Sequence, residues 1–324
     1  MDASSTANKT GLIGFPIEHS LSPVMFRAVY EYYELDWHYE LYSAADHEAF
    51  DRQIAQLQTD DGFIGVNITM PYKKAAAQAL LKAGGTLQGD AAVIQAVNLV
   101  SVVPGEKDGP RGTKAPALLS GHSVDGAGFV ASLIRHRGLD PKDIRVLILG
   151  SGSASAAICL ALAKAKAADI RIVSRSRLRA DEFANLLSNY CAEQGFSTTI
   201  AGLSYADTME LSHMLRQAQL VVNATPVGME PDDSALLSSD DLKPDHTVID
   251  LVYGRGPTAL LTSARQAAAA AADGLGTLVE QAALSFGIWA DAVSIDPKPQ
   301  HARVADIMQR AARAELQRRE LMAE

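Results

Sequence analysis

Short apolar runs rich in β-branched residues alternate along the chain with segments in which apolar residues recur at helical spacing. The apolar runs cover residues 11–15, 37–42, 62–68, 144–150, 170–173, 220–225 and 247–251. Strands that alternate with helices are typical of βαβ units, in which helices cover both faces of a parallel sheet. The pattern therefore predicts the α/β fold class.

Proline marks two of the expected helix starts. Ser22 and Pro23 follow the first apolar run, and we expect the serine to cap a helix that has the proline in its first turn. Pro71 marks a second start. The alanine run at 267–272 favours helix on propensity alone. Further helices are expected over 156–167, from about Pro257, over 274–289 and at the charged C-terminus.

Length and charge narrow the classes of protein. The 324 residues are enough for about two domains of ~150 residues each. With 29 basic and 38 acidic residues the net charge is −9, so no overall field attracts nucleic acid or an anionic membrane. No uncharged apolar run approaches the ~18 residues of a membrane span. Residues 1–10 lack the order of a signal peptide, so we expect a cytoplasmic protein.

The spacing of cysteine and histidine gives no support to a metal site or a disulfide framework. Cys159 and Cys191 have no CxxC partner, and the eight histidines show no HxxxH or HExxH spacing. We therefore expect neither feature. Residues 104–116 concentrate proline, glycine and charge, which predicts a solvated loop.

A turn of small residues joins the apolar run at 144–149 to the next helix. Small side chains let backbone N–H groups approach a diphosphate at the positive end of a helix. The third glycine of the GxGxxG pattern is missing, so a bare tight turn is the alternative interpretation. The residues expected at a diphosphate are Gly150, Ser151, Gly152, Ser153 and Ala154.

The next apolar run ends in a basic sequence, residues 174–179, which reads SRSRLR. An acidic residue here would select NAD by accepting a hydrogen bond from the ribose 2′-hydroxyl. Three arginines and two hydroxyls instead offer charge-assisted hydrogen bonds to a 2′-phosphate. We therefore predict NADP rather than NAD, and a solvated basic helix start is the alternative. The expected contacts are Ser174, Arg175, Ser176 and Arg179.

Polar residues outside this half of the chain are candidates for catalysis. Lys73 lies in the first turn of an expected helix, where the macrodipole disfavours a cation by about 0.3–1 kcal/mol. Donating or accepting a proton at a reacting oxygen would explain that place, and a solvated lysine is the alternative. Asn98 interrupts an apolar run and either ties a loop or meets a polar ligand. Asp125, Ser20 and Ser22 have a helix cap as their alternative role.

Taken together, these stretches resemble the shikimate dehydrogenase family. The segments that carry the resemblance occur in the family's order and extend from about Gly11 to Trp289. They are GFPIEHSLSP, GVNITMPYKK, AVN, VDGAGF, LGSGSAS, VVNATPVGM and DGLGTLVEQAALSF.

The resemblance implies two domains and one reaction. Residues 1–124, completed by C-terminal helices over 274–324, would bind substrate, and a Rossmann domain over 125–273 would bind NADP in a facing cleft. The enzyme would reversibly reduce 3-dehydroshikimate to shikimate by hydride transfer, a step toward chorismate and the aromatic amino acids. Its partners would be small molecules only, with no nucleic acid and no membrane, and it would be a monomer or a homodimer.

The resemblance also implies roles for individual residues. Lys73 and Asp125 match the family's catalytic pair. The substrate contacts would be Ser20, Ser22, Thr69, Asn98, Tyr253 and Gln281. Further cofactor contacts would be Ala224, Thr225, Pro226 and Gly274.

The chain departs from the family's pattern at several of these segments. Val124 stands where the family has threonine, and losing a hydroxyl beside a hydroxylated ligand can shift substrate preference. The other departures are Leu99, Thr277, Phe26 with Arg27, and Gly254 with Arg255. Two alternatives therefore stand beside shikimate: a quinate/shikimate dehydrogenase that uses NAD or NADP, and a dinucleotide-responsive binding protein without catalysis.

Overall fold

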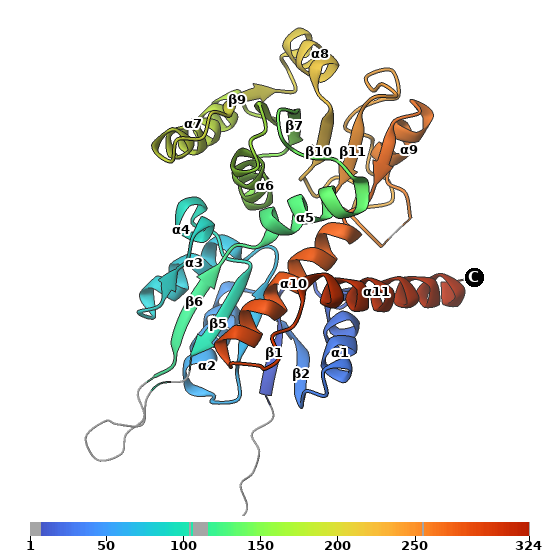
Figure 1. Ribbon diagram of the computed structural model, residues 1–324. Helices are drawn as coiled ribbons and strands as arrows, with labels where there is room; N and C mark the ends of the chain where they lie inside the picture. Colours follow the sequence, from blue (N-terminus) through green and yellow to red (C-terminus); the bar gives the residue numbers. More distant parts are fainter. Residues whose placement is uncertain (1–7, 104, 106–115, 255, 324) are drawn as a thin grey trace, which may run out of the picture. The chain divides into compact units, whose positions relative to one another are not determined.

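The computed structural model describes residues 8–103, 105, 116–254 and 256–323 (Figure 1). The chain divides into two compact units. Unit 1 is Met1–Val124 with Gln281–Glu324, and unit 2 is Asp125–Glu280. Each contains a six-stranded sheet with helices, which confirms the predicted α/β class. Residues 1–7 and most of the predicted loop at 104–116 lie outside the described residues.

Unit 1 has a mixed sheet of strand order β2-β1-β3-β5-β6-β4. The strands are β1 (Asn8–Gly14), β2 (Trp37–Ser43), β3 (Gly65–Ile68), β4 (Thr86–Leu87), β5 (Leu99–Val103) and β6 (Leu118–His122). β2, β1 and β3 are parallel, whereas β5 runs antiparallel to both β3 and β6. The helices are α1 (Ser22–Tyr32), α2 (His47–Thr59), α3 (Lys73–Lys82), α4 (Asp90–Ile94), the second part of α10 (Leu275–Ala292) and α11 (His301–Ala323).

The start of α1 differs from the prediction in one respect. The proline does lie in the first turn, but Leu21 occupies the N-cap position and Ser22 is already helical. The predicted cap by Ser22 is therefore wrong. The Ser20 hydroxyl oxygen instead accepts a hydrogen bond from the Ser22 amide at 3.2 Å. It satisfies one of the N–H groups that a helix start leaves without an intrahelical partner.

Both faces of the unit 1 sheet carry packed side chains. On one face, Val66 and Val100 belong to a core cluster with residues of α2 and α3, among them Phe50 and Leu80. On the other face Trp289 of α10 donates from its indole nitrogen to the Val100 carbonyl at 3.0 Å. The indole can cross β3 because Gly65 lies beneath it: a Cβ there would be 2.2 Å from the indole nitrogen.

Unit 2 has a wholly parallel sheet of order β12-β11-β10-β7-β8-β9. In chain order this is 3-2-1-4-5-6, read from the end that carries β9, the arrangement of the Rossmann fold. The strands are β7 (Arg145–Leu149), β8 (Asp169–Ser174), β9 (Thr199–Ser204), β10 (Leu220–Asn223), β11 (Thr247–Asp250) and β12 (Ala270–Ala272). The helices are α5 (Asp125–Arg137), α6 (Ser153–Lys164), α7 (Arg177–Glu193), α8 (Thr208–Gln217), α9 (Ala259–Gln266) and the start of α10.

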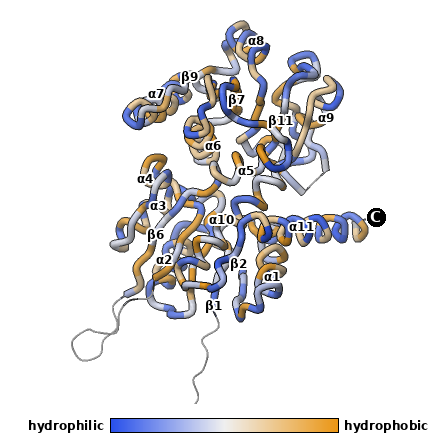
Figure 2. The backbone as a smooth tube through the Cα atoms, in the orientation of Figure 1, coloured by the Kyte–Doolittle hydropathy of each residue, from blue (hydrophilic) through white to orange (hydrophobic). Residues whose placement is uncertain are grey.

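The helix α6 is apolar around its circumference (Figure 2), and every residue from Ser155 to Ala163 is buried. Cys159 lies in this buried stretch and Cys191 in α7, and both are free thiols. Among the described residues no three His, Cys, Asp or Glu side chains are grouped to hold a metal. The described helices include none with the length and apolar character needed to cross a membrane.

The alanine run does not form the helix that its propensity favours. α9 ends at Gln266, Ala268 has a positive φ of 56°, and Ala270–Ala272 forms β12. The helix interpretation is wrong because β12 completes the sheet edge by pairing with β11 over three residues. A local preference of a few tenths of a kcal/mol per residue is small beside such tertiary contacts.

The second crossing between the units falls within α10, between Glu280 and Gln281, and not at the expected Gly274. The first turns of α10 belong to unit 2 because they pack on α5. A Cβ on Gly276 would lie 2.4 Å from the Ser132 hydroxyl oxygen. The buried Glu280 carboxylate accepts hydrogen bonds from Arg135 at 3.3 Å and, with the imidazole donating, from His136 at 3.1 Å.

Candidate active site

The predicted substrate residues of unit 1 gather at one edge of its sheet. This edge contains the carboxyl ends of β1 and β3 and, because β5 is antiparallel, the amino end of β5. Unit 1 contains Ser20, Ser22, Thr69, Lys73, Asn98 and Gln281. The serines follow β1, Thr69 and Lys73 follow β3, and Asn98 precedes β5.

Lys73 is the first residue of α3, as its place after Pro71 predicts. Its side chain is half-buried. Its carbonyl oxygen accepts a hydrogen bond from the Val97 amide at 2.8 Å, which brings the segment before β5 beside the helix start. The Thr69 amide donates to the Ile13 carbonyl at 2.9 Å and so joins the ends of β1 and β3. The backbone thus places Lys73 next to the segment that carries Asn98.

The Asn98 side chain is buried, with 3% of its surface exposed. Its Oδ1 accepts from the Val124 amide at 2.8 Å, and its Nδ2 donates to Oε1 of Gln281 at 3.3 Å. The amide therefore ties the loop that follows β6 and also lies beside a second predicted substrate residue. A direct hydrogen bond thus brings together the side chains of two predicted residues, Asn98 and Gln281.

A chain of hydrogen bonds through Tyr39, Asn67 and Ser285, which the sequence interpretation missed, ends at the backbone of Gln281. The Tyr39 hydroxyl donates to Oδ1 of Asn67 at 3.0 Å, and Nδ2 of Asn67 donates to the Ser285 hydroxyl at 2.9 Å. That hydroxyl donates in turn to the Gln281 carbonyl at 2.9 Å. We call these four residues the Asn67 network. An asparagine between apolar strand residues is its only sequence signal, because its partners lie on β2 and α10.

The loop that carries Ser20 is held by the last helix. Nη1 of Arg319, on α11, donates to the carbonyl oxygen of His19 at 2.8 Å, and its Nε donates to Glu315 at 2.8 Å. Arg318 pairs with the same carboxylate at 2.7 Å. The hydrogen bonds from the two arginines lower the pKa of Glu315 to about 2. Glu315 thereby orients the guanidinium group that reaches the serine loop.

In unit 2 the glycine turn between β7 and α6 leaves room above the helix start. Gly150 has a φ of +112°, and its amide donates to the Val173 carbonyl at 2.7 Å. Gly152 occupies the N-cap of α6, no described side chain caps the helix, and a Cβ there would meet none of the described atoms within 4 Å. Uncapped N–H groups beside open space fit a diphosphate, so the turn suits a dinucleotide.

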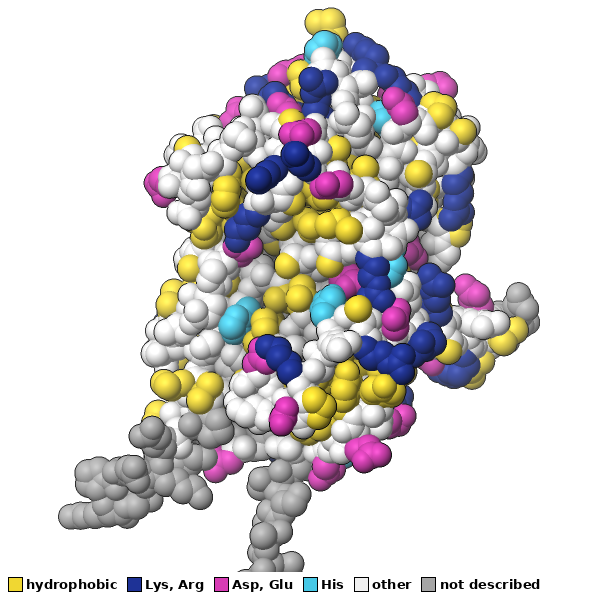
Figure 3. Space-filling view, viewed as in Figure 1, with side chains coloured by type: hydrophobic (Ala, Val, Ile, Leu, Met, Phe, Trp, Pro, Cys, Tyr) yellow, Lys and Arg dark blue, Asp and Glu magenta, His cyan; other side chains and the backbone are white. Residues whose placement is uncertain are grey.

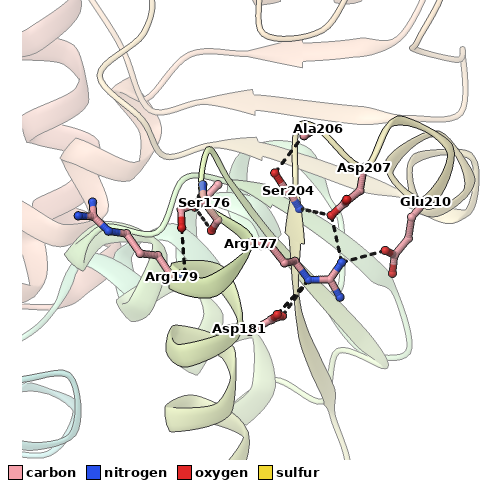
Figure 4. A network of polar contacts seen from close by, with 9 residues as sticks. Ser176, Arg177, Arg179, Asp181, Ser204, Ala206, Asp207 and Glu210 are labelled. Carbon is pink, nitrogen blue, oxygen red and sulfur yellow. Dashed lines mark hydrogen bonds and ion pairs between the residues drawn. The ribbon is translucent and has the colours of Figure 1, made fainter.

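The basic sequence after β8 is arranged differently from the prediction of three available arginines. Arg177 is bound by Asp181, Asp207 and Glu210 (Figure 4). The hydrogen bonds to these carboxylates raise the pKa of Arg177 further above its usual range. Arg175 and Arg179 are exposed.

The two serine hydroxyls of the same turn shape it. Ser174 Oγ accepts from the Ser176 amide at 3.1 Å and donates to the Ser176 carbonyl at 2.9 Å. Ser176 Oγ caps α7 by accepting from the Arg179 amide at 3.4 Å.

The loop after β10 is anchored by a buried polar group that the sequence interpretation also missed. Asn223 Oδ1 accepts from the amide and hydroxyl of Thr225 at 2.9 and 2.7 Å. Its Nδ2 donates to Asp250 Oδ1 at 2.9 Å, and Thr258 donates to Asp250 Oδ2 at 2.7 Å. Burial raises the pKa of Asp250. This group fixes the loop that carries the predicted cofactor residues Ala224, Thr225 and Pro226.

The remaining predicted residues also lie in unit 2. Asp125 is the half-buried first residue of α5, in the first turn rather than before it, and Tyr253 follows β11. Gly274 allows a close backbone approach, because a Cβ there would be 2.1 Å from the Leu251 carbonyl oxygen. This close packing explains a glycine at position 274 without a cofactor, and the contact of Gly274 with the cofactor stays a prediction.

The departures from the family pattern fall in different surroundings. Phe26 is fully buried and stacks on Tyr39 with ring centroids 4.3 Å apart, so it is a core residue of unit 1. Leu99 is fully buried and Val124 is 6% exposed. The Thr277 hydroxyl oxygen is buried with no hydrogen-bond partner among the described residues. Arg255 lies outside the described residues.

The fold and the polar sheet edges define the class: a protein of two α/β units, one with the strand order of dinucleotide-binding Rossmann domains. The family model described as the shikimate dehydrogenase substrate binding domain matches residues 12–100. The chain is 34% identical over 297 residues to the NADP(+) shikimate dehydrogenase of Methanopyrus kandleri, covering 89% of this chain and 92% of that protein. It is 31% identical over 322 residues to that of Geobacter metallireducens, covering 98% and 100%.

The solved structures that resemble this chain include enzymes of the same name as these relatives. A shikimate dehydrogenase crystallised with NADP+ has a TM-score of 0.78 at 27% identity, covering 96% of each chain. The enzyme from Thermus thermophilus in complex with NADP(H) and shikimate has a TM-score of 0.73 at 27% identity, covering 94% of this chain and 99% of that chain. The chain belongs to the shikimate dehydrogenase family, and the resemblance read from its sequence is confirmed.

Proposed function

We propose that this protein is an NADP-dependent dehydrogenase that reversibly reduces 3-dehydroshikimate to shikimate. The observation that carries the proposal is the placement of Lys73, Asn98 and Gln281 at one sheet edge, in a chain whose relatives of matching length are named NADP(+) shikimate dehydrogenases. The cofactor would be NADP, held in unit 2 by the glycine turn, by the turn at 174–179 and by the loop after β10.

The chemistry asks for a proton donor at a defined oxygen. Bound NADPH supplies the hydride, and the ketone oxygen that gains negative charge must then receive a proton. We assign that transfer to Lys73, with Asp125 as the second member of the pair. An ammonium group also stabilises the developing charge. In the reverse direction Lys73 accepts the proton of the alcohol.

The remaining polar residues would hold the substrate. Asn98 and Gln281 offer amide groups to ring hydroxyls, and Ser20, Ser22, Thr69 and Tyr253 would surround the substrate carboxylate. The Asn67 network supports this assignment, because the Ser285 hydroxyl, which accepts from Asn67 at 2.9 Å, donates to the Gln281 backbone carbonyl at 2.9 Å. A preformed site spends less binding free energy on ordering its side chains.

Quinate is a second candidate substrate because of one residue. Val124 is apolar where the family has a hydroxyl, and its backbone amide is already used by Asn98. A pocket that lacks one hydroxyl loses a means of distinguishing cyclic polyols. Cytoplasmic location and a monomeric or homodimeric state stay predictions.

The test is a panel of initial rates with shikimate and quinate against NADP and NAD. We expect the highest kcat/KM for shikimate with NADP. Equal or better turnover of quinate with NAD would replace the proposal by its alternative. A protein that binds NADPH but turns over neither acid would be a dinucleotide-responsive binding protein.

Two variants test the residue assignments within that panel. Lys73→Ala should lower kcat by about 100-fold or more, since general acid–base catalysis contributes that much. Arg175→Ala should raise the KM for NADP by about tenfold or more, as expected for a lost charge-assisted hydrogen bond. Full activity of the lysine variant, or an unchanged KM in the arginine variant, would remove that residue from the site.

A further inference from the structure

Arg177 is the one arginine of the turn at 174–179 with three carboxylates around it. Its Nε lies 3.0 Å from Asp181, and its Nη1 lies 3.0 Å from both Asp207 and Glu210. In Figure 4 its guanidinium group points toward these acids, whereas the side chain of Arg179 extends in the other direction. We call Asp181, Asp207 and Glu210 the acidic cluster. It combines residues of α7, of α8 and of the turn before α8.

The acidic cluster lies against the turn proposed to bind the 2′-phosphate. The Tyr205 amide donates to the Ser174 carbonyl at 3.2 Å, so the turn after β9 packs on the end of β8. Burial raises the pKa of Tyr205 to about 12, and the positive charge of Arg175 opposes this rise. Asp207 lies two residues further on, and its carboxylate accepts from the Ser204 amide at 3.2 Å. One short turn therefore faces both Arg175 and Arg177.

Three carboxylates so close to this turn work against an anion. The acids are between 37% and 43% exposed, so their field extends into the solvent that a phosphate would occupy. Acidic residues near this ribose are what selects NAD over NADP. The sequence thus combines a basic turn that favours NADP with neighbouring acids that oppose it, and Arg177 lies between the two.

We propose that Arg177 is a specificity-determining residue for NADP that acts by offsetting part of the negative charge of the acidic cluster and not by contacting the phosphate. This inference rests on the proposed function, because it takes the turn at 174–179 as the 2′-phosphate site. Arg177 pairs with the three carboxylates, while Arg175 and Arg179 stay exposed and would bind the phosphate. It is a positioning residue in this role.

The experiment compares the selectivity for NADP over NAD in wild type and in Arg177→Gln. Selectivity is the ratio of kcat/KM for the two cofactors with shikimate. The KM for NADP should rise about fivefold or more, while the KM for NAD stays within about twofold, because only NADP carries the 2′-phosphate. The loss should shrink as salt is added, since exposed charges are screened beyond about 10 Å at 0.1 M salt. Arg177→Lys should retain part of the selectivity.

Removing the charge of two of the acids distinguishes an effect of Arg177 through the acidic cluster from a direct contact with the 2′-phosphate. In the double variant Asp207→Asn with Glu210→Gln, the KM for NADP should stay equal or fall. Adding Arg177→Gln to it should leave the selectivity at least as high as in wild type, because the net charge of the group is then −1 instead of −2. If Arg177 touches the phosphate, that triple variant loses the full selectivity, and the proposal is overturned. The double variant keeps the test available should Arg177→Gln fail to fold.

Two controls make the failures distinguishable. Arg52→Gln removes an exposed arginine that pairs with Glu48 in unit 1, and it should leave both KM values unchanged. Arg175→Ala tests the proposed site itself. If Arg175→Ala lowers the selectivity and Arg177→Gln does not, the role of Arg177 is wrong and the proposed function stands. If neither variant lowers it, the cofactor does not bind at this turn.

Discussion

Buried serines show how much a single residue depends on its partners. Ser285 and Ser155 both lie in helices and are fully buried. Ser285 joins Asn67 to the Gln281 carbonyl, whereas the Ser155 hydroxyl has no hydrogen-bond partner in the described part of the chain. A buried polar group without a partner costs about 1–3 kcal/mol, and a paired one contributes about 1 kcal/mol. Replacement by alanine should therefore destabilise the protein at Ser285 but not at Ser155.

Ser285→Ala should lower the free energy of unfolding by about 1–3 kcal/mol, because Nδ2 of Asn67 loses a buried acceptor. It should also raise the KM for shikimate, since Gln281 loses its support. Ser155→Ala should leave stability unchanged or raise it by about 1 kcal/mol. Urea unfolding of the two variants and steady-state kinetics measure these effects. Destabilisation by Ser155→Ala, or none by Ser285→Ala, would contradict the hydrogen-bond assignments.

His246 should make stability depend on pH. It is 1% exposed, its Nδ1 accepts from the Lys243 amide at 3.1 Å, and its Nε2 donates to the Leu215 carbonyl at 3.1 Å. Burial lowers its pKa, and the positive charge of Lys243 acts in the same direction. The hydrogen bond to the Leu215 carbonyl and the charge of Asp245 oppose this shift. Burial also lowers the pKa of His122. The folded protein therefore favours the neutral ring at both positions.

The sign follows from linkage. Unfolded histidine has a pKa of about 6.5, so the stability from the neutral rings is complete above that pH and is lost as the pH falls below it. The free energy of unfolding should decrease as the pH falls from about 7.5 to 5.5, and less steeply in His246→Gln. An identical slope in wild type and variant would show that His246 does not carry the effect.

At the residue scale, sequence reasoning found the residues proposed to act on a ligand more readily than the residues that hold them in place. The motif around Lys73 and Asn98 is local, so its spacing is visible in the chain. Asn67 and Asp250 depend on partners from other strands and helices, which no local pattern shows. The sequence interpretation counted Arg177 among three arginines that could reach a 2′-phosphate and did not show its ion pairs, because Asp207 and Glu210 are distant from it along the chain.

Among the elements, α11 shows how a surface helix can reach a site. It packs on α1, and Arg303 near its start donates to the Tyr32 hydroxyl at 3.0 Å, at the far end of α1 from the serine loop. At the other end, Arg319 binds the carbonyl oxygen of His19. The helix thus spans α1 and supports the loop that carries Ser20.

Arg319→Gln should raise the KM for shikimate by about three- to tenfold with little change in kcat, because the serine loop loses a charge-assisted hydrogen bond. Arg318→Gln is the matched control: it removes the same charge and the same partner, Glu315, while the bond from Arg319 to His19 stays in place. Steady-state kinetics of both variants decide the matter. Equal effects would mean that charge alone, and not the loop contact, is responsible.

The elements also show where local patterns mislead. Strand β9 (Thr199–Ser204) was missed, but four strands of the Rossmann sheet, β7, β8, β10 and β11, were predictable because buried parallel strands appear as continuous apolar runs. Ala270–Ala272 was not, because alanine carries no strand signal and its conformation is set by pairing with β11. The prediction of the α1 cap was wrong for a similar reason. Ser20 and Ser22 are both suitable capping residues, and the geometry of the turn decides which hydroxyl accepts a hydrogen bond from a backbone amide.

For the whole molecule, alternating apolar runs were enough for the α/β class, and the family motifs for the order of the units. They did not give the mixed pairing in unit 1, where β5 runs antiparallel between β3 and β6. They also placed the return to unit 1 too early, since Glu280 binds Arg135 and His136 of α5. On the face seen in Figure 3, basic and acidic side chains are interspersed, in keeping with small-molecule partners.

The central claim is a hydride transfer from NADPH to a cyclic keto acid, and isotope transfer measures it most directly. The purified protein is incubated with 3-dehydroshikimate and NADPH that carries deuterium at the transferable position, and the product is analysed by mass spectrometry and NMR. The account predicts shikimate with a single deuterium on the ring carbon that was the ketone of 3-dehydroshikimate. Lys73→Ala should form this product at a much lower rate. Unlabelled shikimate, or no product while NADPH remains bound and unoxidised, would contradict it.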